Sequence, residues 1–386
     1  MASEKKAIYA FSGDPITFGH KDIVERASNA FEELVVGIGV NTRKASSYTF
    51  TLEERKQMAE KALAHLPNVS VVSFEGLLVD YAFENKIPYI VKGVRNSVDV
   101  DFEETLHHVG ASQKLGIDTF ILFAKPELSH VSSSAVKELQ RNQGSITEYV
   151  PVHVKQKLEE RLSSQYIVGI TGTPGSGKSY VTNQLVQIAL AENIPAHNIE
   201  LDFIGHYILG KGMEPAYVAV REQIQKTFGT EVMSANGYVN RAILGEKVFN
   251  DYSELKKLDD IMRTPMTVRL RRELSEKKGL ILLNAALLAE ANWLSICNNN
   301  TIVVDAHSEV QYERLRNRQL NEEQISRRLG SQYSTAQKEN YVLDKIQQDN
   351  NGRLWKFDNS TLGNETNIQA LYDSIKQELR FDTVHK

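Results

Sequence analysis

The feature that most constrains the fold is a glycine-rich stretch in the second half of the chain. Residues 172–179 have the sequence GTPGSGKS and directly follow the apolar run YIVGI at 166–170. A short strand, a loop matching GxxxxGK(S/T) and a following helix indicate a P-loop, whose backbone N–H groups surround phosphate oxygens. In this motif Lys178 reaches the β- and γ-phosphates of a nucleotide, and the Ser179 hydroxyl binds Mg²⁺. The residues expected to hold the nucleotide are Gly172, Gly175, Gly177, Lys178 and Ser179.

Apolar runs alternate with helix-like segments through both halves of the 386-residue chain, which favours two domains with parallel sheets covered by helices. Thr51 and Glu54 predict a capping box at the start of one helix. A polar joint near Ser163 places the domains at 1–163 and 164–386. The first half opens with a predicted strand in the apolar run KAIYAF, and further predicted strands follow at 34–40, 69–74, 88–93 and 119–124. In the second half they are 166–170, 280–288 and 301–306, before a charged helical region from 308 to 346.

Charge and cysteine content restrict the classes of partner. The formal net charge is −4, so the chain as a whole has no electrostatic attraction to nucleic acid or to an anionic membrane. Its one cysteine, Cys297, cannot form an intrachain disulfide, which fits a reducing compartment. The first residues, MASEKKAIYAF, lack an apolar signal core. We therefore expect a cytoplasmic protein without nucleic acid or membrane partners.

A second phosphate-binding pattern lies near the start of the chain. The loop GDPITFGH follows the first predicted strand and ends at the helix-like segment KDIVERA. The positive N-terminal end of such a helix favours an anion. Thr17, Phe18, Gly19 and His20 match the (H/T)xGH signature of nucleotidyltransferases, in which the histidine can donate a hydrogen bond to a nucleotide phosphate.

Together with this loop, the segments TLEER, VKGVRN, HVSSSAVKEL and NQGSITEYVP make residues 5–162 resemble bacterial phosphopantetheine adenylyltransferase. The resemblance implies a Rossmann-like nucleotidyltransferase that joins 4′-phosphopantetheine to the α-phosphate of ATP, with His20 and Lys44 as catalytic residues. It also suggests that the chain forms a homo-oligomer through this domain. By itself a serine run before a helix is more often a cap. The residues implied for ATP binding are Ser12, Gly19, His20, Ser132, Ser133 and Ser134. Those implied for the acceptor phosphate are Ser12, Lys44, Lys92 and Arg95.

Around the P-loop, the segments IELDFIGH, NRAILGEKVF, YERLRNRQLNEEQISRRLGSQ and KFDNST make residues 166–386 resemble dephospho-CoA kinase. The resemblance implies a P-loop domain like the nucleoside-monophosphate kinases, with a helical lid, Mg²⁺ with ATP as donor and dephospho-CoA as acceptor. It makes Asp202 the catalytic base and Lys178 a second catalytic residue. Taken alone, Asp202 also fits a helix cap and the arginines a solvated helix face. The residues implied for the acceptor are Asp202, His206 and Arg241. Further residues implied for ATP binding are Arg314, Arg318 and Asn359.

The two resemblances together imply a bifunctional coenzyme A synthase, but the chain departs from both families. The first family's Gly-Thr-Phe-Asp-Pro is Phe-Ser-Gly-Asp-Pro at 11–15, Lys92 replaces an arginine, and the segment 103–105 is altered. In the kinase half, Thr264 replaces a histidine. Two alternatives therefore stay open. The chain could act on another substrate, such as a nicotinamide nucleotide, or one half could have lost catalysis and only bind nucleotide.

Overall fold

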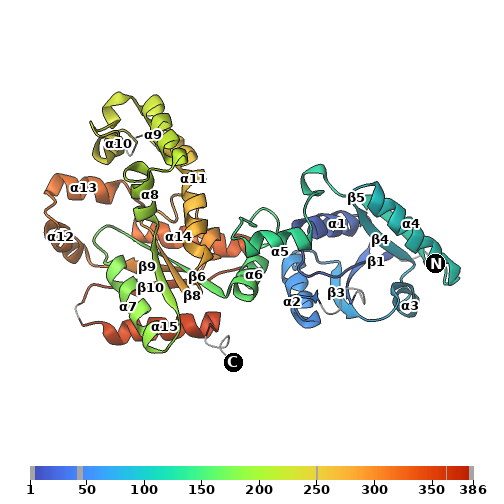
Figure 1. Cartoon of the computed structure of the whole chain (residues 1–386). Coiled ribbons are helices and arrows are strands. Elements are labelled where there is room, and N and C mark those ends of the chain that lie inside the picture. The colour runs from blue at the N-terminus through green and yellow to red at the C-terminus, as the bar shows by residue number, and fades with distance from the viewer. Residues whose placement is uncertain (1–4, 41–46, 249–250, 362, 382–386) are drawn as a thin grey trace. The chain divides into compact units, whose positions relative to one another are not determined.

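The structure is a computed structural model, and it describes residues 5–40, 47–248, 251–361 and 363–381. The chain divides into two units, Met1–Leu162 and Ser163–Lys386, and each has its own five-stranded sheet (Figure 1). No helix within the described residues is long and apolar enough to cross a lipid bilayer. Lys44, which the resemblance implies as a catalytic residue, lies outside the described residues.

The N-terminal unit is built on a sheet with its first strand in the middle. The strand order is β3-β2-β1-β4-β5 and every pair is parallel, which confirms the predicted doubly wound fold. Ala7 and Tyr9 face one core cluster and Ile8 faces the other, because successive side chains of a strand point to opposite faces. The strands are β1 (Lys6–Phe11), β2 (Glu33–Gly39), β3 (Val69–Phe74), β4 (Tyr89–Val94) and β5 (Asp118–Phe123).

Helices cover both faces of this sheet. Four of them, α1, α2, α5 and α6, contribute to the larger core cluster, and α3 contributes to the smaller one. Thr51 and Glu54 form the predicted capping box of α2. Thr17 caps α1, which therefore begins at Phe18, before the predicted KDIVERA segment. The helices are α1 (Phe18–Ser28), α2 (Leu52–Leu63), α3 (Leu78–Glu84), α4 (Ser97–Ser112), α5 (Ser133–Arg141) and α6 (Val152–Leu158).

The sheet of the C-terminal unit also has its first strand in the centre. The order is β10-β9-β6-β8-β7, and all pairs are parallel. Every residue of β6 is buried, so the P-loop that follows it leaves from the middle of the unit. The strands are β6 (Gln165–Gly172), β7 (Ala196–Glu200), β8 (Gly279–Asn284), β9 (Thr301–Asp305) and β10 (Leu354–Asp358).

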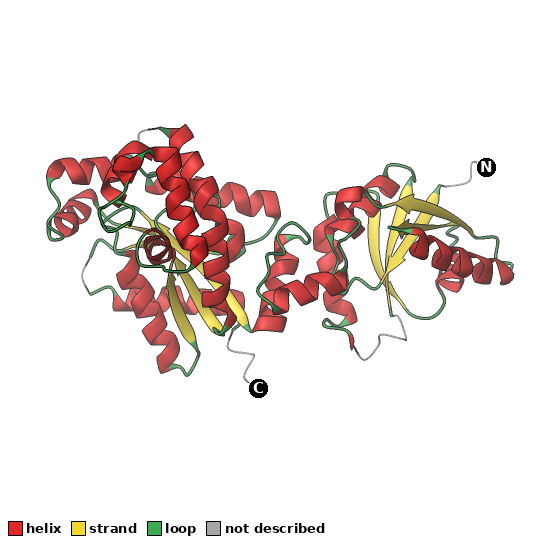
Figure 2. Ribbon diagram, turned by 45° about the horizontal axis from the view of Figure 1, so that its top comes forward, coloured by secondary structure: helices red, strands yellow, loops and turns green. Residues whose placement is uncertain are grey.

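Helices lie on both sides of this second sheet as well (Figure 2). One face is covered by α7 and α15, and the other by α8, α9, α11 and α14, each set with its own core cluster. The helices are α7 (Lys178–Ala191), α8 (Leu201–Leu209), α9 (Pro215–Phe228), α10 (Arg241–Val248), α11 (Tyr252–Ser275), α12 (Ser308–Arg316), α13 (Glu322–Gly330), α14 (Thr335–Asp349) and α15 (Glu365–Leu379).

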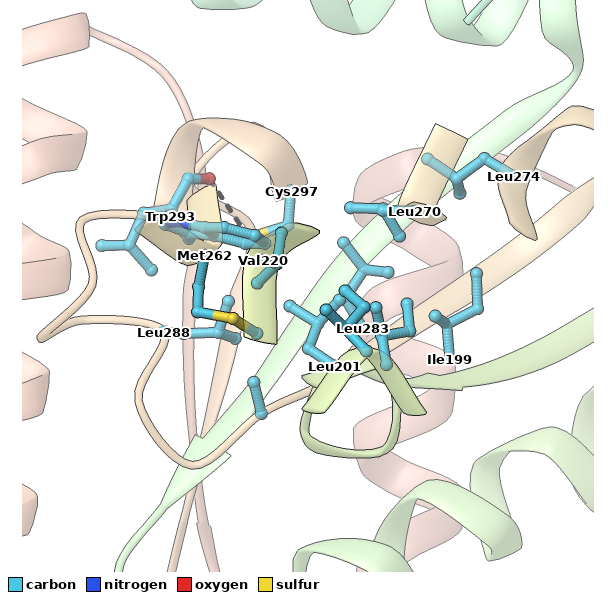
Figure 3. Close-up of a cluster of buried hydrophobic side chains, with 14 of the residues drawn as sticks. Ile199, Leu201, Val220, Met262, Leu270, Leu274, Leu283, Leu288, Trp293 and Cys297 are labelled. Atoms are coloured by element: carbon cyan, nitrogen blue, oxygen red, sulfur yellow. Dashed lines mark hydrogen bonds between the residues drawn. The ribbon is translucent and has the colours of Figure 1, made fainter. Parts of the chain in front are cut away.

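The core cluster beneath α8, α9 and α11 is shown in Figure 3. Leu283 of β8 is fully buried there and lies near Leu201 and Ile199. The single thiol belongs to the same cluster, since Cys297 is buried and its Sγ donates to the backbone oxygen of Leu294 at 3.2 Å. Cys297 is therefore a packing residue.

One predicted strand was too long. Residues 280–288 were expected to form a single strand, but β8 ends at Asn284. Two residues later, the backbone oxygen of Ala286 accepts hydrogen bonds from Thr171 Oγ1 at 3.0 Å and from Lys338 Nζ at 2.7 Å. Because side chains hold this carbonyl, the chain leaves the sheet although the sequence stays apolar.

Truncation of Leu283 to alanine should lower the free energy of unfolding of the C-terminal unit by about 2–5 kcal/mol, because it leaves a cavity in a fully buried site. Both tryptophans of the chain, Trp293 and Trp355, lie in this unit, so tryptophan fluorescence during urea unfolding follows it selectively. The control is Leu343→Ala, at a side chain that is 47% exposed. Equal midpoints for the two variants would contradict the assigned core.

Candidate functional site

A buried carboxylate fixes the loop between β1 and α1. Asp14 accepts hydrogen bonds from the backbone N–H groups of Thr49 at 3.1 Å and Phe50 at 3.0 Å. It also accepts one from Lys137 Nζ at 2.6 Å. Thr49 and Phe50 precede α2, and Lys137 lies on α5. One carboxylate therefore holds two distant segments, the one before α2 and helix α5, against its own loop.

His20 lies in that first turn with one ring nitrogen already bonded. Its Nδ1 accepts from the backbone N–H of Thr17 at 3.1 Å, so in the neutral ring Nε2 carries the proton. Burial, with the charge of Arg95 as a smaller cause, lowers the pKa of His20 to about 4. The ring is therefore neutral near pH 7, and Nε2 can donate a hydrogen bond to a ligand.

Two of the cations implied for the acceptor phosphate, Lys92 and Arg95, are each paired with a carboxylate. Lys92 Nζ lies 2.9 Å from Glu103 Oε2, and Arg95 Nε donates to Asp99 Oδ2 at 3.1 Å. Burial raises the pKa of Tyr9 on the neighbouring strand β1, and the negative charge of Glu103 raises it further. These charges thus gather where β1 and β4 end, beside the loop that carries His20.

The serine run at the start of α5 has mixed roles. Ser132 is the N-cap of α5, and its Oγ accepts from the N–H of Ala135 at 3.2 Å, as the alternative of a simple cap predicts. Ser133 Oγ donates to the backbone oxygen of Pro15 at 2.8 Å and so ties α5 to the loop of His20. Ser134 is exposed in the first turn of α5.

A buried arginine that sequence reasoning missed supports the same loop. The guanidinium of Arg55 donates to the backbone oxygen of Ser12 and, at 3.0 Å, to that of Gly39. It also lies 4.0 Å from the centre of the Tyr48 ring. The TLEER segment contains Arg55, but its pattern indicated only a helix start. Gly19 follows at the other end of the loop, inside α1.

In the C-terminal unit the P-loop leaves β6 through positions that only glycine can occupy. At Gly172 φ is +155°, and a Cβ would lie 2.1 Å from a backbone oxygen of β9. At Gly177 φ is +91°, and a Cβ would lie 2.1 Å from Asn359 Nδ2. The hydroxyls of Thr173 and Ser176 are buried without a hydrogen-bond partner among the described residues. Since buried polar groups are normally paired, these hydroxyls fit a loop that a ligand completes.

Lys178 folds back on this loop. Its Nζ donates to the backbone oxygens of Gly172 at 3.0 Å and Thr173 at 3.3 Å. Burial lowers the pKa of Lys178 to about 8, against the raising effect of Asp202 and with the help of Lys338. The ammonium group is thus within electrostatic reach of Asp202, and phosphate oxygens can take the place of the loop carbonyls.

The three residues implied for the kinase acceptor come together on α8 and α10. Asp202 and His206 lie on one face of α8, four residues apart, and Arg241 is the first residue of α10. Burial and then Arg241 lower the pKa of His206, whereas Asp202 raises it. All three groups are therefore within electrostatic reach of one another, and Lys178 is within electrostatic reach of Asp202.

Two of the residues implied for ATP binding buttress the P-loop. Arg314 donates to the backbone oxygens of Gly175 at 3.3 Å, Ser176 at 3.2 Å and Asn359 at 2.8 Å. Asn359 Nδ2 donates to the backbone oxygen of Ser176 at 2.8 Å. A cavity of about 410 Å³ opens beside them, and Arg318 lines it. This cavity adjoins the start of α7, where the base and ribose of a nucleotide held by the P-loop have room.

A second buried cation that the sequence did not reveal is Lys338 on α14, within electrostatic reach of Lys178. It is fully buried, and its Nζ donates to Glu290 Oε1 at 2.6 Å and to the backbone oxygen of Ala286 at 2.7 Å. Its charge lowers the pKa of Lys178, and Asp202 acts on Lys338 in turn. Within a charged helical segment, nothing in the sequence distinguishes this lysine from exposed ones.

Comparisons with known proteins match both units. A cytidylyltransferase-like family model matches residues 12–139, and a dephospho-CoA kinase model matches residues 166–354. The phosphopantetheine adenylyltransferase of Flavobacterium johnsoniae is 41% identical over 154 residues, covering 40% of this chain and 99% of that protein. That of Clostridium perfringens is 36% identical over 157 residues, covering 41% of this chain and 94% of that protein. The solved structure of TT1252 from Thermus thermophilus shares 25% identity with this chain, and the match covers 56% of this chain and 98% of that one, with a TM-score of 0.43.

The lowered pKa of Lys178 predicts that nucleotide binding to the C-terminal unit weakens as the pH rises above about 8. Above that pH the free protein has lost the ammonium proton, whereas a lysine bound to phosphate keeps it, so binding must take up a proton. Calorimetric titration with a non-hydrolysable ATP analogue on both sides of pH 8 measures this dependence. Lys178→Arg is the control, because its guanidinium stays protonated. The same pH dependence in both proteins would contradict the prediction.

Proposed function

The chain belongs to the phosphopantetheine adenylyltransferase family through its N-terminal unit and carries a dephospho-CoA kinase domain in its C-terminal unit, and from this premise we propose how it works. It catalyses the last two steps of coenzyme A biosynthesis. ATP first gives its adenylyl group to 4′-phosphopantetheine, and a second ATP then phosphorylates the ribose 3′-hydroxyl of the dephospho-CoA formed. The observation that carries this function is the presence of both domains in one chain, because the product of the first is the substrate of the second.

In the first step an oxygen of the acceptor phosphate bonds to the α-phosphorus of ATP, and pyrophosphate leaves. His20 donates from Nε2 to an oxygen of the α-phosphate, where negative charge grows in the transition state. Lys92 and Arg95 exchange their carboxylate partners for the acceptor phosphate, which reduces the repulsion between the two substrates. For Lys44 and Ser12, the assignment rests on the family resemblance.

A cavity of about 150 Å³ beside Lys92 suits the uncharged arm of phosphopantetheine. Leu78, Leu106 and Val109 contribute to its walls, and Glu103 lies at its polar side next to Lys92. Apolar walls with a few polar groups are typical of sites for small organic ligands. The altered segment that contains Glu103 therefore supplies a pocket and a charge partner, which supports a functional N-terminal unit.

In the second step the 3′-hydroxyl oxygen of dephospho-CoA bonds to the γ-phosphorus, and ADP leaves. Asp202 accepts the hydroxyl proton. Lys178 moves from the loop carbonyls to the phosphates, and Arg318 offsets charge on the transferring group. Mg²⁺ usually takes only one or two protein ligands besides the phosphates. The exposed Ser179 hydroxyl at the start of α7 fits that role, and the ion would neutralise charge on the phosphates of ATP.

An apolar surface on the N-terminal unit supports association of the chain with a second copy of itself. Helix α4 has no buried residue, and Val98, Phe102 and Val109 on it are 72%, 54% and 57% exposed. The edge strand β5 exposes Phe120 and Phe123. Exposed apolar edge strands pair with other chains unless they are covered. We therefore place a homo-oligomer contact on α4 and β5.

Two substitutions separate the half-reactions. His20→Ala should lower dephospho-CoA formation by about 10²–10⁴-fold and leave phosphorylation of added dephospho-CoA unchanged. Asp202→Asn should do the reverse, with ATP binding retained, because the amide cannot accept the hydroxyl proton. Mass spectrometry of both products measures each rate. A fully active Asp202→Asn variant, or loss of both activities from either change, would contradict the assigned roles.

Replacement of Val98 and Phe123 by lysine should dissociate the oligomer, because the contact would then bury unpaired charges. Sedimentation velocity should show a larger species for the unmodified chain and a smaller one for this double variant. Leu190→Lys, on an exposed position of α7, is the control and should sediment like the unmodified chain. A monomeric unmodified chain would rule out the proposed contact.

A further inference from the structure

Phe11, the last residue of β1, covers one face of the His20 ring. The ring centres are 4.3 Å apart and the planes differ by 9°. Carbon atoms in contact lie ~3.5–4.0 Å apart, so the two rings form a close, slightly displaced stack, which aromatic side chains favour. The adenylyltransferase motif Gly-Thr-Phe-Asp-Pro has glycine at the position of Phe11. The stack on His20 therefore arises from a residue in which this chain differs from the motif.

Gly13 is the second position at which this loop differs from the adenylyltransferase motif. The related motif has its aromatic residue at this position, whereas here the backbone φ of Gly13 is +61°. A Cβ on Gly13 would lie 3.2 Å from Ile38 Cδ1 and 3.4 Å from Phe11 Cε2. The ring of Phe11 thus stands against the point from which a side chain of residue 13 would start. Relative to the motif, glycine and phenylalanine have exchanged positions 11 and 13, and an aromatic ring still lies beside His20.

With Phe11 in place, the imidazole of His20 is held on two sides. Phe11 covers a face of the ring, and the N–H of Thr17 bonds Nδ1 on its edge at 3.1 Å. Thr17 is itself buried as the N-cap of α1, so this contact is fixed by the helix start. A ring with one face and one nitrogen held has little freedom to turn about its side-chain bonds. Its Nε2 therefore points in one direction.

We propose that Phe11 is a positioning residue for adenylyl transfer, which acts through His20 by fixing the plane of the imidazole and the direction of Nε2–H. The inference rests on the function proposed for this site. Because the contact with the α-phosphate matters most where charge grows in the transition state, loss of the stack lowers kcat more than it raises the KM for ATP.

The test compares Phe11→Leu, which keeps apolar bulk without a ring, with Phe11→Tyr, which keeps the ring. Phe11→Leu should lower kcat for dephospho-CoA formation by about 10–100-fold and change the KM for ATP by less than about threefold. Phe11→Tyr should keep most of the activity. In ¹⁵N spectra, His20 of the unmodified chain should show the Nε2–H tautomer, and in Phe11→Leu a mixture.

Two controls are built into the chain. Phosphorylation of added dephospho-CoA by the C-terminal unit should stay unchanged in every variant. Phe31→Leu removes another half-buried ring of the same unit, one whose ring contacts among the described residues are Tyr89 and Phe120, and it should keep full adenylyl transfer.

Wild-type kcat in Phe11→Leu would overturn the inference. So would a loss that appears only in KM, or an equal loss in Phe11→Tyr and Phe31→Leu. If instead the unmodified chain forms no dephospho-CoA, the function proposed for the N-terminal unit is wrong. The stack of Phe11 on His20 then has no role in adenylyl transfer.

Discussion

Both units depend on one constraint of parallel sheets: the chain leaves the carboxyl end of the central strand through a tight loop and enters a helix. Each unit starts with that central strand, β1 in one sheet and β6 in the other. The strands on its two sides are reached by connections that run in opposite directions, which opens a crevice at the carboxyl end. The following helix directs its N-terminal N–H groups into the crevice. His20 and the P-loop occupy equivalent places for this reason.

Paired charges at buried or partly buried positions are the second feature that the two sites share. In the N-terminal unit Lys92 and Lys137 are paired with Glu103 and Asp14. In the C-terminal unit Lys338 is paired with Glu290. Burying an unpaired charge costs free energy. Cations that would bind a phosphate therefore need a carboxylate or a backbone oxygen as partner while no ligand is bound. Among the described residues, the hydrogen-bond partners of Lys178 Nζ are backbone oxygens, and burial lowers the pKa of Lys178 to about 8. Burial also lowers the pKa of Lys338, although Glu290 raises it.

The local parts of this architecture could be predicted from the sequence, because each is encoded within a few neighbouring residues. The strand before Gly172, the cap formed by Thr51 and the loop of His20 belong to this class. The supporting contacts could not be predicted, because they join distant segments. Arg55 reaches the backbone of Ser12 across 43 positions, and Lys338 reaches Ala286 across 52. The end of strand β8 was mispredicted for the same reason. The apolar run 280–288 does not reveal that the distant side chains of Thr171 and Lys338 bind the backbone oxygen of Ala286.

The roles of the residues that differ from the family motifs, Phe11 and Glu103, follow from their contacts with distant residues in the fold. Phe11 differs from the glycine of the adenylyltransferase motif, yet its ring stacks on His20. Glu103 stands in an altered segment, yet it pairs with Lys92 at the edge of a cavity. Both departures are therefore compatible with a working site, which favours two active units over a chain with one degenerate half.

One chain carries out two successive reactions with ATP, first an adenylyl transfer and then a phosphoryl transfer. The most direct measurement is mass spectrometry of the unmodified protein with 4′-phosphopantetheine and ATP labelled with ¹⁸O separately in the α- and γ-phosphates. The account predicts that dephospho-CoA appears first with the α-label and is then converted to coenzyme A, which gains the γ-label on its 3′-phosphate. Accumulation of dephospho-CoA without coenzyme A, or no product at all, would contradict it.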